Sequence, residues 1–426
     1  MAQLCFIGGM QWGYECKGKI IDFFSGNFDL AAKYGHGHDS RHNCQINGKH
    51  YVYSMLPLAT VRGIESLILP SSFVELNVLI NEAGSMPGIK FTVDERCCVV
   101  MDYHIQIDAE RRMIHMKPKF NSKDDGIGPA FESFQSGDYI SVGDLLNRES
   151  LKIKYETNLE KYCPYLASMG SGFFRVASLK ENMRKSIEEY LKKGEILRKH
   201  IGTTNGIIKR ALVEDKDIIF EGSYGTLLDP LFGLNPDRTH SSTMAVKALE
   251  CAGLPPQKMH KIGVTKAYMS RNAVSPFPTK IDDIEILKRI IQQGDEQNSD
   301  PWVPKEREVG WLDFVLFNFA DSLNQYDEIA LTKLDALAGL NEIKICIAYR
   351  DGNGRFINEI DSMGQLIGAE PVYETFEGFP KIENIHRFKD LHPNARKLVD
   401  RISDLTNDRL SLISIGPERD QMIRLF

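Results

Sequence analysis

The segment of the chain best suited to chemistry lies near its start, at residues 11–19 (QWGYECKGK). Lys17 and Lys19 flank one glycine, after a short apolar run and before helical spacing at residues 19–24. Backbone N–H groups and the N-terminus of a helix favour an anion, and a lysine adds positive charge. The segment predicts a polyphosphate-binding loop or, alternatively, a glycine-rich turn with solvated lysines. Its spacing of glycine and lysine is not that of the common P-loop.

Alternating apolar runs and helical patterns are expected to position this loop. Such alternation favours an α/β fold with a mostly parallel central sheet and helices on both faces. The predicted strands lie at residues 4–8, 66–70, 97–101, 217–220, 328–332 and 342–349, and the clearest helices lie at residues 180–200 and 282–292.

We expect one large domain over residues 1–426, because no repeat or low-complexity linker divides the chain. Helical and loop excursions from the sheet are expected at about residues 100–210 and about residues 280–310. Gly/Pro-rich loops at residues 126–129 and 275–279 interrupt the pattern.

The composition excludes several classes of protein. The net charge of −6 argues against binding to a nucleic-acid polymer, which needs a basic face. No apolar run approaches the roughly 20 residues that a membrane span needs. The first residues lack a basic leader, and the eight cysteines do not recur with metal-site spacing. We therefore expect reduced thiols and a cytoplasmic protein.

Residues 11–19 resemble the signature QWGDEGKGK of the adenylosuccinate synthetase family. Other segments resemble family motifs in the same order along nearly the whole chain, and the resemblance is therefore specific for the fold. It implies an adenylosuccinate synthetase-like fold, related to that of P-loop proteins. These segments are residues 220–229 (FEGSYGTLLD), 266–268 (KAY), 276–279 (PFPT), 310–313 (GWLD), 332–335 (TKLD), 373–375 (YET) and 416–417 (GP).

The resemblance also implies a reaction. In this family GTP phosphorylates the 6-oxygen of IMP, and the amine of aspartate then displaces the phosphate. A base removes the purine N1 proton, and a histidine helps the phosphoryl group to leave GTP. The expected ligands are a purine nucleotide and GTP or another nucleoside triphosphate, with Mg²⁺ as the family's metal. The resemblance further implies a homodimer.

Most positions on the triphosphate side are kept. His42 aligns with the catalytic histidine, and Lys17 and Glu15 are the other catalytic candidates in this part of the site. Asp335 resembles the guanine-reading residue, because a carboxylate accepts from both the N1–H and the 2-amino group of guanine. The triphosphate-binding candidates are Gly13, Cys16, Gly18, Lys19, Lys333, Asp335, Gly416 and Pro417.

The loop departs from the family at three positions. Tyr14, the fourth catalytic candidate, stands where the family has its catalytic aspartate. A phenol with a pKa near ~10 is a poor base at neutral pH and a poor Mg²⁺ ligand, which weakens the case for magnesium. Cys16 replaces a loop glycine. Arg41 replaces a glycine whose carbonyl serves the metal, and its own carbonyl is the metal-ligand candidate.

The acceptor side also departs from the family. The family's TTGRGIGP, which binds the 5′-phosphate, corresponds to residues 122–129 (SKDDGIGP). Asp124 and Asp125 are expected to repel a phosphate, and Lys123 is left to offset them. No arginine occurs between Pro129 and Arg148, where family members supply one to the neighbouring subunit. The other acceptor candidates are Asp39, which replaces Asn, Tyr224, which replaces Gln, and Thr239, which is kept.

The family's aspartate loop, TTGRxRR, corresponds to residues 302–308 (WVPKERE). Lys305 and Arg307 keep positive charge and are the remaining substrate-binding candidates, whereas Glu306 and Glu308 oppose that charge. The alternative interpretation is a solvated surface loop.

Three hypotheses follow. We favour a diverged ligase that joins an aspartate-like amino acid to C6 of a purine nucleotide other than IMP. The acceptor dGMP, used by phage and archaeal relatives, is the natural comparison. The second hypothesis is an ordinary adenylosuccinate synthetase that tolerates these changes. The third is a nucleotide-binding paralogue without ligase activity, acting as a sensor or as a subunit of an assembly with a protein partner. Phosphate release from GTP that needs a particular acceptor distinguishes the first from the third.

Overall fold

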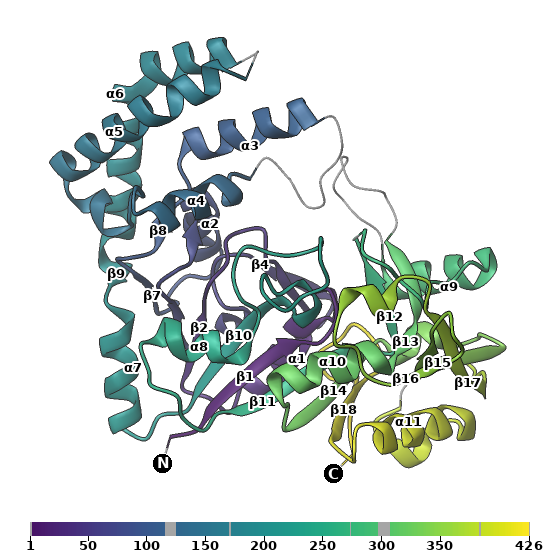
Figure 1. Cartoon of the computed structure of the whole chain (residues 1–426). Coiled ribbons are helices and arrows are strands. Elements are labelled where there is room, and N and C mark those ends of the chain that lie inside the picture. The colour runs from purple at the N-terminus through teal and green to yellow at the C-terminus, as the bar shows by residue number, and fades with distance from the viewer. Residues whose placement is uncertain are drawn as a thin grey trace.

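A central sheet of ten strands is formed by the described part of the chain (Figure 1). The computed structural model describes residues 2–115, 125–169, 172–272, 274–296, 307–382 and 385–425. All neighbouring strands of this sheet run parallel except the first pair. In order across the sheet the strands are β19 (Met422–Arg424), β18 (Leu410–Ser414), β14 (Glu328–Thr332), β11 (His260–Lys266), β1 (Leu4–Gly9), β10 (Ile218–Gly225), β2 (Leu30–Lys33), β5 (Glu65–Ile68), β7 (Phe91–Asp94) and β9 (Ile201–Gly202).

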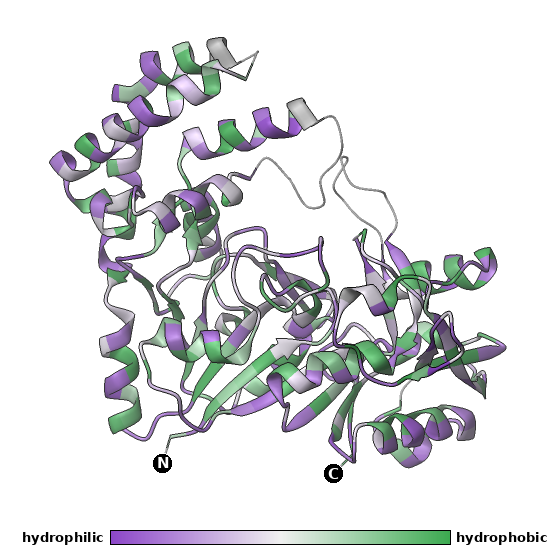
Figure 2. Cartoon of the chain, in the orientation of Figure 1, coloured by the Kyte–Doolittle hydropathy of each residue, from purple (hydrophilic) through white to green (hydrophobic). Residues whose placement is uncertain are grey.

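The sheet is covered on both faces, as predicted. Successive side chains of a strand point to opposite faces, and in β1 Phe6 packs into one hydrophobic core cluster while Ile7 packs into another. Helix α1 (Lys17–Ser25) contributes to the cluster of Ile7. Helices α8 (Ala245–Ala252), α10 (Phe314–Asn324) and α11 (Pro393–Leu405) contribute to that of Phe6. Figure 2 shows the strands near β1 as largely hydrophobic.

Two predicted strands lie outside the central sheet. The segment 342–349 forms β15 (Glu342–Arg350) of a second sheet, where it pairs with β13 (Glu308–Asp313), β16 (Phe356–Ile357) and β17 (Glu370–Glu377). That sheet also contains β12 (Tyr268–Arg271). The segment 97–101 yields only β8 (Cys98–Val99), which pairs with β6 (Phe73–Val74). A buried apolar run does not reveal which sheet it joins, because both environments bury its side chains.

Helices occupy most of the first expected excursion. Figure 1 shows α3 (Asp102–His115), α4 (Ile127–Ser136), α5 (Arg148–Ala167) and α6 (Gly172–Leu197) grouped at one end of the molecule, away from β14 and β18. The predicted helices at 180–200 and 282–292 correspond to α6 and α9 (Ile284–Gly294). The single-domain organisation stays a prediction. The other described helices and strands are α2 (Leu76–Ser85), α7 (Thr204–Val213), β3 (His42–Ile46) and β4 (Lys49–Tyr53).

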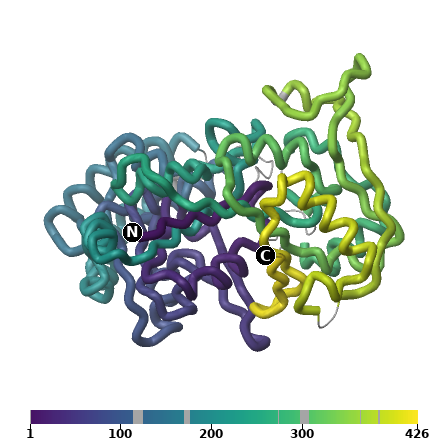
Figure 3. Tube along the Cα trace, turned by 90° about the horizontal axis from the view of Figure 1, so that it is seen from below, coloured from purple at the N-terminus to yellow at the C-terminus, as the bar shows by residue number. Residues whose placement is uncertain are grey.

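The end of the chain returns to its beginning. Figure 3 shows the C-terminal segment, in yellow, beside the purple N-terminal part. Arg419 donates from Nε and Nη2 to the two carboxylate oxygens of Asp22 in α1, both at 2.6 Å. Arg62 donates to the same carboxylate at 3.0 Å. Because Asp22 is buried, this charge needs both partners. No helix in the described ranges is long and apolar enough to cross a membrane.

Candidate nucleotide-binding site

The candidate site lies at the carboxyl ends of β14, β11, β1 and β10 (Figure 1). These strands are parallel neighbours, so the segments that follow them leave from one edge of the sheet. Ligands of open α/β sheets bind outside this edge. The motifs at residues 11–19, 220–229, 266–268 and 332–335 all meet there, although they lie far apart in the sequence.

Glu15 stabilises the loop between β1 and α1 through contacts within that loop. Its Oε1 accepts from the backbone N–H groups of Gln11 and Gly13, both at 2.8 Å. Its Oε2 lies 2.8 Å from Nζ of Lys17, and both side chains are buried. Gly13 has a φ of 95°, and an added Cβ would lie 3.0 Å from Cα of Tyr224, so this position requires glycine. The lysine of the loop is therefore held by a carboxylate of the same loop.

Cys16 and Gly18 mark the start of α1. Cys16 is the N-cap residue with a φ of 61°, a conformation that glycine adopts more readily, and its side chain caps no backbone group. A Cβ on Gly18 would lie 2.2 Å from the carbonyl oxygen of Asn43, so no larger residue fits where α1 meets β3. The glycine expected at position 18 is thus required by packing, whatever ligand the loop binds.

Lys19 holds the loop of Gly416 and Pro417. Its Nζ donates to Ser414 Oγ at 2.9 Å, to the Gly416 carbonyl at 2.6 Å and to the Gln421 carbonyl at 2.9 Å. Burial lowers the pKa of Lys19 to about 8. Three protein acceptors satisfy this ammonium group, so Lys19 positions the C-terminal loop against α1.

His42 is held by Glu221. Nδ1 of His42 donates to Oε1 of Glu221, and Oε2 of Glu221 accepts from the backbone N–H of Leu58 at 2.7 Å. Burial lowers the pKa of His42, although the Glu221 carboxylate opposes that effect. A carboxylate that accepts from Nδ1–H fixes the tautomer and leaves Nε2 for a ligand. The arrangement suits a histidine that acts through Nε2.

The guanine-reading candidate Asp335 lies in the short turn after β14. Lys333 precedes it with a φ of 61°, and its Nζ donates to the Gly294 carbonyl at 2.5 Å. Burial raises the pKa of Asp335. Oδ1 of Asp335 is buried and has no hydrogen-bond partner among the described residues. A buried acceptor without a donor is rare, so this oxygen fits a site completed by a ligand.

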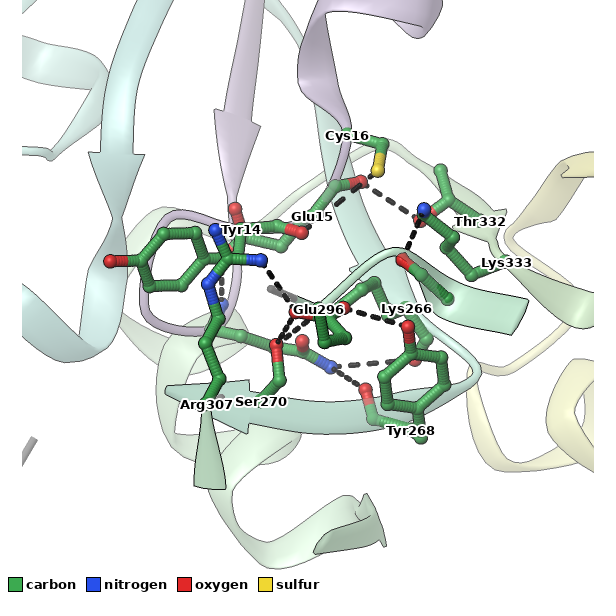
Figure 4. Close-up of polar contacts among 12 residues, drawn as sticks. Tyr14, Glu15, Cys16, Lys266, Tyr268, Ser270, Glu296, Arg307, Thr332 and Lys333 are labelled. Carbon is green, nitrogen blue, oxygen red and sulfur yellow. Dashed lines mark hydrogen bonds and ion pairs between the residues drawn. The ribbon is translucent and has the colours of Figure 1, made fainter. Parts of the chain in front are cut away.

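Tyr14 contacts Asn272, which follows β12, and Arg307, which precedes β13; Figure 4 shows Arg307 beside the Tyr14 ring. Nδ2 of Asn272 donates to its hydroxyl oxygen at 3.2 Å. The guanidinium carbon of Arg307 lies 3.9 Å from the centroid of its ring. Burial raises the pKa of Tyr14, which leaves the phenol protonated at neutral pH. Tyr14 can therefore donate a hydrogen bond but is not a general base.

Glu296 joins Arg307 to the family segment at 266–268 (Figure 4). Arg307 Nη1 donates to its Oε2 at 2.7 Å, and Lys266 Nζ lies 2.5 Å from its Oε1. Tyr268 and Ser270 donate further hydrogen bonds to it, at 2.7 and 2.8 Å. Burial opposes its ionisation, but Lys266 and Arg307 outweigh burial and lower its pKa to about 2. A protein carboxylate thus already neutralises the one described arginine of the expected aspartate loop.

The predicted acceptor residues lie around the end of β10. The Tyr224 hydroxyl donates to Oδ2 of Asp39 at 2.7 Å, and Tyr224 has a φ of 55°. Thr239 is half-buried, and its backbone N–H donates to the Leu228 carbonyl at 2.8 Å. Arg41 is exposed immediately before His42. Lys123 and Lys305 lie outside the described residues, as do Asp124 and Glu306.

Two further observations refine the sequence interpretation. Glu308 was expected to oppose the charge of the aspartate loop, but its carboxylate accepts from Arg271 at 3.0 Å and Lys280 at 2.7 Å. In the described ranges, no group of three or more His, Cys, Asp or Glu side chains could hold a metal ion. Tyr14 is protonated, and Glu15 is bonded to Gln11, Gly13 and Lys17 within its own loop, so the family's metal stays a prediction for this chain.

Sequence reasoning missed Asn272, Glu296 and His36. Asn272 and Glu296 bind the side chains of Tyr14 and Arg307, and His36 packs its ring 5.0 Å from that of Tyr224. Glu296 was detectable only as an acidic residue after an expected helix. Asn272 and His36 carry no local signal, because their importance arises from residues distant in the sequence.

Comparisons with known proteins agree with this geometry. The sequence model of the adenylosuccinate synthetase family matches residues 6–423. The adenylosuccinate synthetase of Streptococcus gordonii is 33% identical over 424 residues, covering 97% of this chain and 96% of its own length. That of Geobacillus kaustophilus is 33% identical over 425 residues, with the same coverage. This chain therefore belongs to the adenylosuccinate synthetase family.

Two solved structures share the fold. Fully ligated adenylosuccinate synthetase from Plasmodium falciparum has a TM-score of 0.90 and 26% identity, covering 99% of this chain and 100% of that one. The succinoaminodeoxyadenylate synthetase of cyanophage S-2L, bound to dGMP and to dATP as an energy donor, has a TM-score of 0.63 and 14% identity. It covers 100% of this chain and 96% of the phage chain, and this second likeness concerns the fold alone.

Proposed function

We propose that this protein is a GTP-dependent ligase that forms a carbon–nitrogen bond at C6 of a 6-oxopurine other than IMP, using the amine of an aspartate-like amino acid. The observation that carries the proposal is Tyr14. A protonated phenol, fixed by Asn272 and Arg307, occupies the position where the family resemblance places a base. Since the surrounding loop remains ordered around Glu15 and Lys17, the change alters the acceptor chemistry and leaves the loop intact.

The triphosphate side supports GTP as co-substrate. The buried, unpartnered oxygen of Asp335 matches the donors that guanine offers and adenine lacks. In the proposed reaction the γ-phosphoryl group of GTP transfers to O6 of the purine. The amine then attacks C6, phosphate leaves with the O6 oxygen, and the products are GDP, phosphate, a proton and the N6-substituted purine. In this proposal His42 contacts the transferring group through Nε2, and Lys17 balances its charge.

The phage structure supplies the first alternative acceptor to test. Its title names dGMP, a 6-oxopurine with an added 2-amino group. The hydroxyl of Tyr14 accepts from Asn272, so its own proton is available to a purine lone pair. A hydrogen-bond donor at this position favours purine ring atoms that accept a hydrogen bond. The carboxylate that the family has there favours ring atoms that donate one.

A second candidate function is a nucleotide-binding protein without ligase activity. It is favoured by Glu296, whose carboxylate already neutralises Arg307 and thereby competes with an amino-acid carboxylate. Such a protein would bind guanine nucleotides as a sensor or as a subunit of an assembly. We also propose a homodimer, in keeping with the two-fold symmetry of most soluble oligomers, and light scattering at micromolar concentration tests it.

The test of the ligase proposal is acceptor-dependent release of phosphate from GTP. The full chain is incubated with GTP, aspartate and one purine at a time, drawn from IMP, GMP, dGMP and the corresponding nucleosides. Phosphate release stimulated by one purine, with a matching N6-substituted product by mass spectrometry, supports the ligase. Guanine-nucleotide binding without stimulated release by any purine supports the second candidate.

A further inference from the structure

Lys33 is a buried lysine on the same face of the central sheet as His42. It ends β2 and is 3% exposed. Its partner in the parallel strand β10 is Glu221, the carboxylate that binds His42. Ala31 and Ile219, two residues earlier on the two strands, pack in the same hydrophobic cluster. Because side chains two residues apart point to one face of a sheet, Lys33 and Glu221 share the face that His42 occupies.

The ammonium group of Lys33 connects the two segments that flank the hairpin of His42. Its Nζ donates to the carbonyl oxygen of Ser40 at 2.9 Å and to that of Ser54. Ser40 lies two residues before β3, and Ser54 directly follows β4. His42 begins β3 and pairs with Tyr53, the last residue of β4. Lys33 therefore joins the chain that enters the hairpin to the chain that leaves it, beside His42.

Carboxylates offset the buried charge of Lys33. Burial lowers the pKa of Lys33, whereas Glu221, Glu82 and Asp39 oppose this effect. Glu82 of α2 also accepts from the backbone N–H groups of residues 54–56, at 2.6 to 3.0 Å. The chain that leaves the hairpin is thus held by Glu82 through its N–H groups and by Lys33 through a carbonyl oxygen. A buried ammonium group needs such acceptors and opposite charges.

The backbone and the ring of His42 are held by linked supports. Lys33 fixes the backbone on both sides of the hairpin, and Glu221 fixes the ring through Nδ1. The two supports are linked because Lys33 and Glu221 are paired residues of neighbouring strands. A reacting group that moves by about 1 Å can lose ~10²-fold in rate, so the support of this hairpin bears directly on a histidine that acts through Nε2.

We propose that Lys33 is a positioning residue for His42: it holds the hairpin so that the ring presents Nδ1 to Glu221 and Nε2 to the nucleotide. This inference rests on the proposed function, because it concerns how His42 is prepared for that reaction. Lys33 itself does not touch the nucleotide. It acts through the backbone at Ser40 and Ser54.

The kinetic test separates positioning from binding. Lys33→Met leaves the carbonyl oxygens of Ser40 and Ser54 without their donor. We expect kcat for acceptor-dependent phosphate release to fall about 10–100-fold, with KM for GTP changed less than about threefold. Lys33→Arg, whose guanidinium has donors for both carbonyl oxygens, should keep roughly a third or more of the wild-type kcat. A rise in KM as large as the fall in kcat, or no recovery with arginine, would overturn the proposal.

Lys261→Met is the matched control for loss of a lysine–carbonyl hydrogen bond. Nζ of Lys261 donates to the carbonyl oxygen of Asn324 at 2.8 Å, near the amino end of β11 and at the opposite edge of the sheet from His42. A general loss of stability would lower kcat in both lysine variants, whereas positioning affects Lys33→Met alone. We expect Lys261→Met to stay within about twofold of wild type. Equal losses of kcat in Lys33→Met and Lys261→Met would show that Lys33 is only structural.

The ring of His42 gives a readout that does not need the ligase reaction. Nuclear magnetic resonance of protein with ¹⁵N-labelled histidine shows which ring nitrogen carries the proton, and His42→Asn assigns the signal. At pH 8, wild type and Lys33→Arg should show one tautomer with the proton on Nδ1, and Lys33→Met a mixture of both. A single tautomer in all three proteins would refute the positioning role. These spectra decide the inference even if no purine stimulates phosphate release, so the two proposals fail separately. If Lys33→Met does not fold, Lys33→Gln replaces it under the same criteria.

Discussion

The triphosphate side and the acceptor side of the site lie next to each other, yet their polar groups are satisfied differently. On the triphosphate side, Asp335 keeps a buried oxygen without a hydrogen-bond partner among the described residues. On the acceptor side, Asp39 and Tyr224 bind each other, and Tyr14 is held by Asn272 and Arg307. A ligand can still complete the contacts of Asp335, whereas Asp39, Tyr224 and Tyr14 contact other side chains of the protein.

This difference follows from what each residue supports. Lys19 joins α1 to the last strand pair, and Glu221 holds both His42 and the backbone at Leu58. Replacing such residues lowers the stability of the fold as well as the affinity for the ligand. Position 14 lies in a loop and contacts other side chains, so it changes at lower cost to the fold. Four measurements test whether the two sides differ in this way.

The largest expected effect concerns IMP. Wild-type protein with GTP, aspartate and IMP should form almost no adenylosuccinate, and Tyr14→Asp should not restore it. Each lost transition-state contact typically costs ~10²-fold or more, and residues that act as a unit are not additive, so repairing one recovers little. A coupled absorbance assay measures the turnover. Turnover of IMP by Tyr14→Asp at a rate typical of the family would show that the acceptor side is intact.

The second effect is on stability. Glu296→Gln leaves Lys266 and Arg307 as buried cations without their shared carboxylate, which should lower the free energy of unfolding by about 3–5 kcal/mol. Urea denaturation followed by circular dichroism measures the loss. Glu285→Gln, on the exposed face of α9, is the control and should cost less than about 1 kcal/mol. Equal losses of unfolding free energy for the two variants would mean that the contacts of Glu296 with Lys266 and Arg307 do not stabilise the fold.

The third effect is on nucleotide selectivity. Asp335→Asn replaces an acceptor oxygen with a donor, so the preference for GTP over ATP should fall by roughly 10–100-fold, the equivalent of about 1–3 kcal/mol. Titration calorimetry with GTP and with ATP gives the ratio, and Asp400→Asn, an equal charge change on the exposed face of α11, is the control. Wild-type protein that binds ATP as tightly as GTP would contradict the assignment of Asp335 directly.

The smallest effect is a dependence on pH. The pKa of Glu296 falls from 4.5 to about 2 on folding, so the unfolded chain binds more protons between these values. The stabilisation is fully present above pH 4.5 and is lost as pH falls toward 2, at roughly 1 kcal/mol per pH unit. Unfolding of wild type and Glu296→Gln at pH 5.5, 4.5 and 3.5 tests this. The difference between them should be constant above pH 4.5 and narrow below it, and a constant difference throughout would refute the ion-pair account.

Sequence patterns predicted β1, β10 and β14 because each contains a buried apolar run, but they missed β11, in which polar residues interrupt the run (HKIGVTK). The family motifs also located the loop at residues 11–19 and the turn of Asp335. They did not reveal the second sheet, because the apolar residues of β15 (EIKICIAYR) predict a strand without indicating which sheet the strand joins.

The contacts between side chains distant in the sequence were not predictable. Arg307 meets Glu296 across residues 297–306, and Tyr14 meets Asn272 across 258 positions of sequence. Sequence reasoning expected Glu308 to oppose the charge of Arg307, whereas Glu308 binds Arg271 and Lys280, because adjacency in the sequence says little about which charges meet in the fold. Rules based on neighbouring residues predict turns and helix caps. Contacts such as Arg307–Glu296 and Tyr14–Asn272 depend on the topology of the whole chain.

The attachment of Lys19 and Asp22 to residues 416–421 has a consequence for how the protein is made. Residues 11–25 are synthesised long before residues 416–421, so Lys19 lacks the carbonyl oxygens of Gly416 and Gln421, and Asp22 lacks Arg419, until that later segment is made. A chain cut short by ten residues would lose β19 as well as Arg419, although every motif before residue 416 would still be present. We therefore expect that chains terminated before residue 416 do not hold the loop at residues 11–19 in place.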